Sequence, residues 1–287
     1  MPEFSNFKIT EPLVLQKPFR EHLKFFLKDF AAYFGINHRG WHDMRRYHYT
    51  PGQEQPHLQV ARLSQQEIDF VIQRSDEYLE EYIRALDQYN DDVLAQTTQG
   101  LALPLLEEIM SKNPVHKRII DIGACYTRVF RKISSKYPDY IWDMVDFPTT
   151  LATANEPVAT SSMEFHSDYP LDYLEKTDHV YDIANINRTL AWMGVDQIGE
   201  YLSILRERAR YVVFAEPCKL LFEPGSLNID AIPAHRPRCY NQNYLVHNYR
   251  AVFERFGFKL IHYDADSSTQ PNTTPLHFII RGVAVPV

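Results

Sequence analysis

The sequence has 287 residues, which is enough for one large domain or for two domains of ordinary size. It carries 30 Lys and Arg residues against 37 Asp and Glu residues, and this net charge of −7 argues against sequence-independent binding to nucleic acid or to anionic lipid. No apolar run approaches the roughly 18 residues of a membrane helix, and the start of the chain has no signal-peptide core. We therefore expect a cytoplasmic protein with no nucleic-acid or membrane partner.

Cysteine and histidine usage gives no sign of a metal centre. The three cysteines, Cys125, Cys218 and Cys239, are too few and too scattered for a disulfide framework or a four-thiolate site. The histidines between residues 38 and 57 lack the helical His-Glu-x-x-His spacing of a zinc motif. We expect reduced cysteines and no metal.

The first 115 residues have the apolar spacing of helices. In residues 68–86 the apolar positions Ile72, Leu79, Ile83 and Leu86 recur on one helical face. Residues 19–33 and 101–109 show the same pattern, and Pro114 ends the region because the residue before a proline avoids the α conformation. We expect residues 1–115 to form a helical region that acts as a lid or a dimerisation surface, which leaves homo-oligomerisation open.

From Arg118 onward, short apolar runs alternate with helical patterns. This alternation is typical of a parallel sheet covered on both faces, that is, a doubly wound α/β fold. The last two strands are joined by a short link without a helix, so the last strand should run antiparallel to its neighbour. The predicted strands are residues 118–124, 140–147, 163–167, 180–186, 210–215, 258–263 and 276–283. The predicted helices are residues 126–137, 196–209 and 244–256, and Gly257 should end the last one.

In open α/β sheets, ligands bind beyond the carboxyl ends of the strands. Asp146 follows the second strand, 23 positions after Gly123, and this spacing suits an acceptor for ribose hydroxyls. Asp168, at the end of the third strand, could accept a hydrogen bond from an exocyclic amine. Together the two carboxylates would bind opposite ends of an adenosine, whereas either one alone could equally be a helix cap or a solvated loop residue.

At this point the chain resembles a known family. The runs RIIDIGACYTRVFRKI, MVDFP, HSDYP, YDIANINRTLAWM and RYVVFAEP resemble the ordered motifs of class I S-adenosylmethionine-dependent methyltransferases, over roughly residues 116–287. More loosely, the chain resembles the sugar O-methyltransferase group. The resemblance implies that Asp121 and Gly123 lie near the methionine part of the cofactor, Asp146 at the ribose, and Asn185 at the sulfonium. It further places Ala124, Cys125, Phe147, Ser167 and Asp168 in the cofactor site, the last two at the adenine edge.

The predicted cofactor loop is poor in glycine. Cys125 and Thr127 follow Gly123 where the family alternates glycines, and the whole sequence contains only 10 glycines. The same departure disfavours a nicotinamide dinucleotide, because Cys125 and Arg128 stand where its pyrophosphate needs glycines.

The candidate catalytic groups follow the fifth strand. His235 is the preferred general base and Glu216 the second, while Asn187, Arg188 and Arg236 could contact the acceptor. The long connection of residues 218–241 could cover the acceptor as a lid, or could be a surface loop without a ligand.

The sequence thus predicts an S-adenosylmethionine-dependent enzyme that methylates a small-molecule acceptor at oxygen. The alternative is a non-catalytic methyltransferase-like domain that binds a partner.

Overall fold

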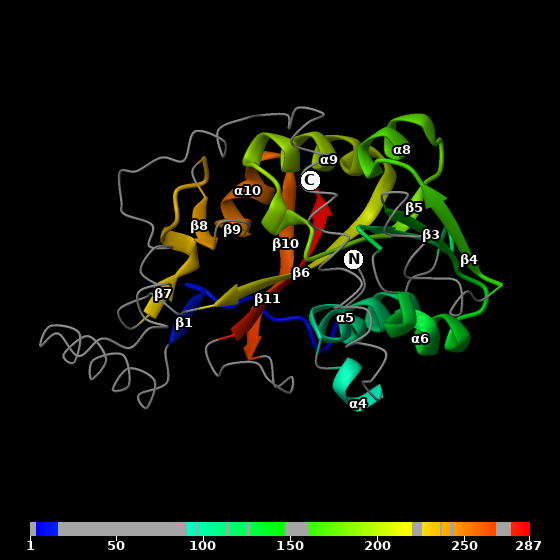
Figure 1. Cartoon of the computed structure of the whole chain (residues 1–287), viewed down its shortest axis with the longest axis horizontal. Coiled ribbons are helices and arrows are strands. Elements are labelled where there is room, and N and C mark those ends of the chain that lie inside the picture. Colours follow the sequence, from blue (N-terminus) through cyan, green and yellow to red (C-terminus); the bar gives the residue numbers. More distant parts are fainter. Residues whose placement is uncertain are drawn as a thin grey trace, which may run out of the picture.

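The computed structural model describes residues 4–16, 91–95, 97–112, 115–124, 127–146, 161–219, 226–235, 237–241, 244–267 and 277–287. These ranges contain a central mixed sheet with helices on both of its faces (Figure 1). The predicted helices at residues 19–33 and 68–86 lie outside the described residues.

The central sheet has seven strands in the order β10-β11-β6-β5-β2-β3-β4. Their bounds are β2 Arg118–Ile122, β3 Ile141–Asp146, β4 Met163–Ser167, β5 Tyr181–Asn187, β6 Ala209–Lys219, β10 Phe258–Ser267 and β11 His277–Pro286. Strands β2 to β6 pair in parallel, and β11 runs antiparallel to both β6 and β10. This order confirms the predicted doubly wound sheet with a reversed last strand.

Each face of the sheet has its own apolar core. Ile120 and Ile122 point to the face covered by α8 (Pro170–Lys176), α9 (Val195–Arg208) and α10 (Tyr249–Arg255). Ile119 points to the opposite face, which is covered by α5 (Thr98–Lys112) and α6 (Arg131–Lys136) (Figure 1). Alternate residues of one strand therefore enter different cores, as expected for a sheet that is buried on both sides.

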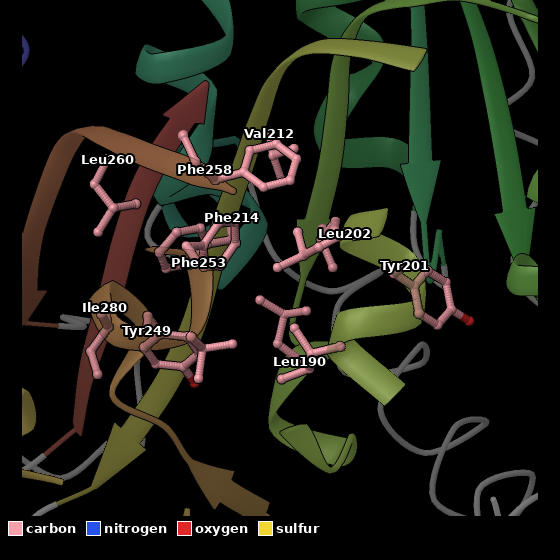
Figure 2. Packing of buried hydrophobic residues seen from close by; sticks show 14 of the residues in the cluster. Leu190, Tyr201, Leu202, Val212, Phe214, Tyr249, Phe253, Phe258, Leu260 and Ile280 are labelled. Carbon is pink, nitrogen blue, oxygen red and sulfur yellow. The ribbon is translucent and has the colours of Figure 1, made fainter. Parts of the chain in front are cut away.

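Aromatic rings fill the core between β6 and α10. Phe214 of β6 stacks on Phe253 of α10 with ring centroids 4.9 Å apart, and Tyr249 lies beside Phe214 at 5.3 Å (Figure 2). All three side chains are buried. Because α10 precedes β10 directly, this packing fixes the end of the sheet that carries the reversed strand.

The described part of the N-terminal region is not uniformly helical. Strand β1 (Val14–Gln16) pairs with β7 (Ser226–Asn228), and Ile9 forms a parallel bridge to Tyr263. The short helix α4 (Asp91–Leu94) precedes α5, and α5 packs against β6, on the sheet itself. The predicted boundary at residue 115 stays a prediction, yet both described pieces before it contact the elements after it.

Two predicted helices begin differently from what the periodicity suggests. Residues 127–130 form a 3-10 turn, η2 (Thr127–Phe130), before α6. Residues 244–246 form the strand β9 (Tyr244–Val246), which pairs with β8 (Arg238–Asn241). Asn248 then caps α10: its side-chain oxygen accepts a hydrogen bond from the backbone nitrogen of Ala251 at 3.0 Å. Asparagine is favoured at this N-cap position and disfavoured in the interior of a helix. Gly257 has a φ of 80° and ends this helix, in the left-handed conformation that glycine favours.

The connection after β6, which was expected to be a lid or a surface loop, contains regular structure. It includes β7 and the 3-10 turn η4 (Ile229–Ala231), and Leu227, Ile229 and Ile232 are buried in the core. These apolar anchors and the pairing with β1 hold the described part of the connection against the domain. The lid role expected for residues 218–241 stays a prediction. None of the helices in the described ranges is long and apolar enough to cross a membrane.

Candidate functional site at the carboxyl ends of the strands

Four polar side chains line one face of the sheet where β2, β3 and β5 end. Asp121 of β2 is in register with Asn185 of β5, and Asp146 and Asn187 end the neighbouring strands β3 and β5. All four are at most 5% exposed. Ile119 and Ile183, two residues before Asp121 and Asn185, face the α5 side, so the polar residues share that face by strand alternation. The register therefore brings together four of the predicted site residues.

Asp121 and Asn185 form the closest polar contact of this row. The Asn185 amide Nδ2 donates to Asp121 Oδ1 at 2.6 Å. Burial raises the pKa of the Asp121 carboxyl to about 7, the Asp146 carboxylate adds to the rise, and the Asn185 hydrogen bond opposes it. A carboxyl group that loses its charge this close to neutral pH responds to any cation placed beside it.

The loop after β2 makes the tight turn that the predicted cofactor site needs. Gly123 has a φ of 80°, and its N–H donates to the carbonyl of Val145 at 2.9 Å. The backbone nitrogen of Ala124 donates to the same carbonyl at 3.3 Å. A Cβ on Gly123 would lie 2.3 Å from Thr189 Oγ1, so both the backbone angle and the space demand glycine. Of the other predicted loop residues, Cys125 and Phe147 lie outside the described residues.

Thr189 connects the β2 loop to the segment after β5. Its hydroxyl lies 3.1 Å from the carbonyls of Ile122 and Asn187, and it can donate to either. The preceding residue, Arg188, has a φ of 57°, which is strained for a residue with a side chain. Strain of this kind concentrates at ligand sites. The sequence pattern did not indicate that Thr189 contacts the predicted cofactor loop.

Glu216 holds the 3-10 turn η3 (Leu190–Trp192) in place. Its fully buried carboxylate accepts hydrogen bonds from the backbone nitrogens of Thr189, Leu190 and Ala191 at 3.0 to 3.1 Å. Burial raises the pKa of Glu216 to about 8, against these hydrogen bonds. Both carboxylate oxygens are thus engaged by backbone donors, which is the geometry of a turn cap.

Several buried polar atoms in the described site have no hydrogen-bond partner. They are Asn185 Oδ1 and both amide atoms of Asn187. His247 follows β9, which contacts η3; burial lowers the pKa of its imidazole to about 4, against hydrogen bonds with the backbone of Leu190 and Met193. Unpaired buried polar groups cost free energy and call for a ligand or water to bond them. The sequence pattern placed His247 inside a helix and so gave no sign of its position beside η3.

The remaining predicted residues are Ser167, Asp168, His235 and Arg236. Ser167 is exposed at the end of β4. Asp168 accepts from the backbone nitrogen of Tyr169 and pairs with Lys176, both at 2.9 Å, so its two oxygens already have partners. His235 is exposed, and Arg236 lies outside the described residues.

Another buried carboxylate, Asp143, belongs to a separate cluster. Arg118 donates to both of its oxygens at 2.7 and 2.8 Å, and His166 and His179 lie within 3.3 Å of it. The ligand atoms of Asp143, Glu164 and His166 are close enough to hold a metal ion, but Arg118 also bonds Glu164 at 2.8 Å. The guanidinium thus already balances the carboxylates. Hydrogen bonds from His166 and Arg118 lower the pKa of Asp143.

A groove of about 430 Å³ lies between α8 and α9, in the helical layer on one face of the sheet. Leu171, Asp196 and Ser203 are among the residues that line it.

Comparison with known proteins finds likeness in structure only. No protein-family model matches the chain, and no curated protein sequence is similar to it. Human N-acetylserotonin methyltransferase in complex with SAM is 14% identical over 78% of this chain and 60% of that chain, with a TM-score of 0.46. The mitomycin 7-O-methyltransferase MmcR is 10% identical over 66% of this chain and 55% of that chain, with a TM-score of 0.43. A pericyclic reaction enzyme is 12% identical over 61% of this chain and 44% of that chain, with a TM-score of 0.43.

The chain spans between 44% and 60% of the length of these three structures. Two of them are methyltransferases, the class that the sequence motifs resemble. The description of the fold therefore rests on the sheet order given above and not on these comparisons.

Proposed function

We propose that this protein binds S-adenosylmethionine at the carboxyl ends of β2, β3 and β5 and transfers its methyl group to an oxygen of a small molecule. The observation that carries the proposal is the buried polar row next to a glycine turn. Asp121, Asp146 and Asn185 share one face of the sheet, and Gly123 turns at its edge with a φ of 80°. The sequence resemblance placed the cofactor at these same positions.

The residues present fit such a cofactor. Gly123 has the positive φ of a tight turn and no Cβ, so the β2 loop packs directly against Thr189 after the end of β5 and lies beside the polar row. Asn185 Oδ1 and both amide atoms of Asn187 are buried and unpaired, so a ligand hydroxyl, amine or carboxylate could bond them. The cofactor carries a methyl group on a positively charged sulfur, and a buried row with two carboxylates suits a cationic ligand.

The roles proposed for the chain are binding and orientation. Asp146, at the end of β3, accepts hydrogen bonds from the ribose hydroxyls, as its position after the second strand of the predicted fold suggests. Asp121 and Asn185 face the methionine part. Glu216 holds η3 through three backbone hydrogen bonds, and we therefore assign it a positioning role in place of the predicted role as a base.

On the acceptor side, we propose Asn187 and Arg188 as contacts. Asn187 offers unpaired donor and acceptor atoms, and Arg188 adds a cation at the strained end of β5. His235 and Arg236 remain predictions for the base and for an anion contact. Methyl transfer depends mainly on alignment of the acceptor with the reactive carbon, so rigid placement of η3 contributes to the rate.

The test is calorimetry with S-adenosylmethionine and S-adenosylhomocysteine, with two variants at opposite ends of one strand. Asp146→Ala removes the carboxylate at the carboxyl end of β3, whereas Asp139→Ala removes an exposed one just before its amino end. We expect binding by the wild type and Asp139→Ala and weakened binding by Asp146→Ala. Absence of binding by the wild type at millimolar ligand would refute the proposal.

Transfer itself is measured with a labelled methyl group and a panel of phenols, sugars and carboxylic acids. Transfer to a phenol or sugar hydroxyl supports an oxygen acceptor. Tight cofactor binding with no transfer to any class would favour the second candidate, a methyltransferase-like binding module. One observation favours this second candidate: neither predicted base lies in a buried site with a free acceptor atom, because Glu216 caps a turn and His235 is exposed.

A further inference from the structure

We infer that Asp121 couples cofactor binding to proton release: in the free protein the carboxyl group holds a proton, and a ligand ammonium group that settles beside the Asp121–Asn185 pair expels it. The inference rests on the proposed function and adds a linkage between pH and affinity at that site.

The geometry places two carboxyl groups in one buried row. Asp121 is 2% exposed and Asp146 is 5% exposed, on neighbouring strands and on the same face. The closest partner of Asp121 is the neutral amide of Asn185, 2.6 Å away. Among the described residues, no Lys, Arg or His side chain forms an ion pair with Asp121. A second full negative charge in this row would therefore lack a counter-ion.

Among the described residues, the groups that shift the pKa of Asp121 lie on the two neighbouring strands. The charged residues of α5 and η2, which are Glu107, Glu108, Lys112 and Arg128, do not contribute to that shift. From β3 the facing titratable group is Asp146, and from β5 it is the uncharged Asn185. Helix α5 and the turn η2 contribute apolar side chains to the core on this face, among them Leu105 and Phe130. An isolated carboxylate in such surroundings is costly, and protonation is the usual way in which proteins avoid that cost. The raised pKa of Asp121, about 7, agrees with this geometry.

Binding of a cation beside Asp121 shifts its carboxyl group from the protonated to the ionised form. An ammonium group close to Asp121 favours the ionised carboxylate, so the O–H bond of the carboxyl breaks and its proton passes to the buffer. No bond to the ligand is formed or broken. S-adenosylmethionine and S-adenosylhomocysteine both carry the ammonium group, whereas adenosine lacks it together with the adjacent carboxylate. A carboxylate beside Asp121 would favour the protonated form, so proton release with S-adenosylhomocysteine alone identifies the ammonium group.

The experiment counts protons by calorimetry of S-adenosylhomocysteine binding in buffers with different ionisation enthalpies, with the ligand's own titration subtracted. A carboxyl group with a pKa of about 7 should release about half a proton per ligand near pH 7 and about 0.9 proton near pH 6. Below about pH 6 the affinity for S-adenosylhomocysteine should fall by up to about tenfold for each unit of pH. Adenosine should bind with no proton release.

Three variants locate the proton. Asp121→Asn should abolish proton release, with circular dichroism and urea unfolding as the check on folding. Asp146→Asn removes the neighbouring charge and should move the release to lower pH, and this second variant keeps the test open if Asp121→Asn does not fold. Asp139→Asn, at the opposite end of β3, should behave as the wild type.

The outcomes separate the two proposals. Proton-free binding of S-adenosylhomocysteine near pH 6 and pH 7 would overturn the inference and leave the proposed function intact. Proton release that persists in folded Asp121→Asn would also overturn it, and would point to another group such as Glu216, whose pKa is raised as well. Absence of binding at any pH would instead refute the proposed function.

Discussion

Replacement of Gly123 by alanine tests whether the β2 loop is built around glycine. The variant forces a Cβ into a backbone with a φ of 80°, which costs about 1–2 kcal/mol for a residue with a side chain. The new Cβ would also lie 2.3 Å from Thr189 Oγ1, and overpacking of this kind costs about 1–3 kcal/mol. We therefore expect Gly123→Ala to lower the free energy of unfolding by roughly 2–5 kcal/mol.

A double-mutant cycle separates the two costs. Thr189→Ala removes the obstructing oxygen together with its hydrogen bond, worth about 1 kcal/mol. In the double variant the steric cost disappears, so the coupling free energy between the two sites should be about 1–3 kcal/mol in the stabilising direction. Gly194→Ala is the matched control, because its Cβ would meet nothing closer than 4.0 Å and should cost under about 1 kcal/mol.

The assay is urea unfolding followed by circular dichroism for all four variants, with S-adenosylhomocysteine affinity measured by calorimetry in parallel. A Gly123→Ala protein that is as stable as Gly194→Ala would refute the strain and overlap described above. Normal ligand affinity in that variant would remove the β2 loop from the cofactor site.

Four further outcomes are expected. Asp146→Ala should weaken S-adenosylmethionine binding by about 1.5–3 kcal/mol in calorimetry, and unchanged affinity would make it an ordinary buried carboxylate. Glu216→Gln has a single accepting oxygen for three backbone donors, so urea unfolding should show a loss of about 1–3 kcal/mol, and no loss would contradict its capping role. Asp143→Asn removes the buried charge that pairs with Arg118 and should cost about 1–3 kcal/mol, because Arg118 keeps its ion pair with Glu164. Because the pKa of Asp143 is lowered, the wild type should lose that stabilisation as pH falls below about 4, and the variant should show a flatter acid limb. Asp121 behaves in the opposite sense: its unfolded pKa is about 3.9 and its folded pKa about 7, so the unfolded state loses the proton first and stability falls as pH rises between these values. Urea unfolding of Asp121→Asn across that range should lack this slope, and an unchanged slope would show that another group causes it.

The sequence by itself determined the chain order of the seven central strands and the strand ends at which the candidate site lies. Apolar runs such as residues 118–122 and 181–186 are strong local signals, because strands buried on both faces need apolar residues at nearly every position. The polar residues near the carboxyl ends of such runs can then be identified, and the candidate residues Asp121, Asp146 and Asn185 were found in this way. The end of α10 at Gly257 was also predictable from a local signal, because glycine tolerates the positive φ that often ends a helix.

Only the tertiary structure decided which polar groups meet and which are already occupied. The three backbone partners of Glu216 belong to a turn about 26 residues earlier in the chain, and the obstruction above Gly123 comes from Thr189, so neither appears in any local pattern. Pairing of β1 with β7 anchors the connection after β6 through two short strands that lie more than 200 residues apart. Charge state is equally non-local: Asp121 and Asp143 are the same residue type on adjacent strands, yet an amide faces one carboxyl and a guanidinium the other, and their pKa values move in opposite directions.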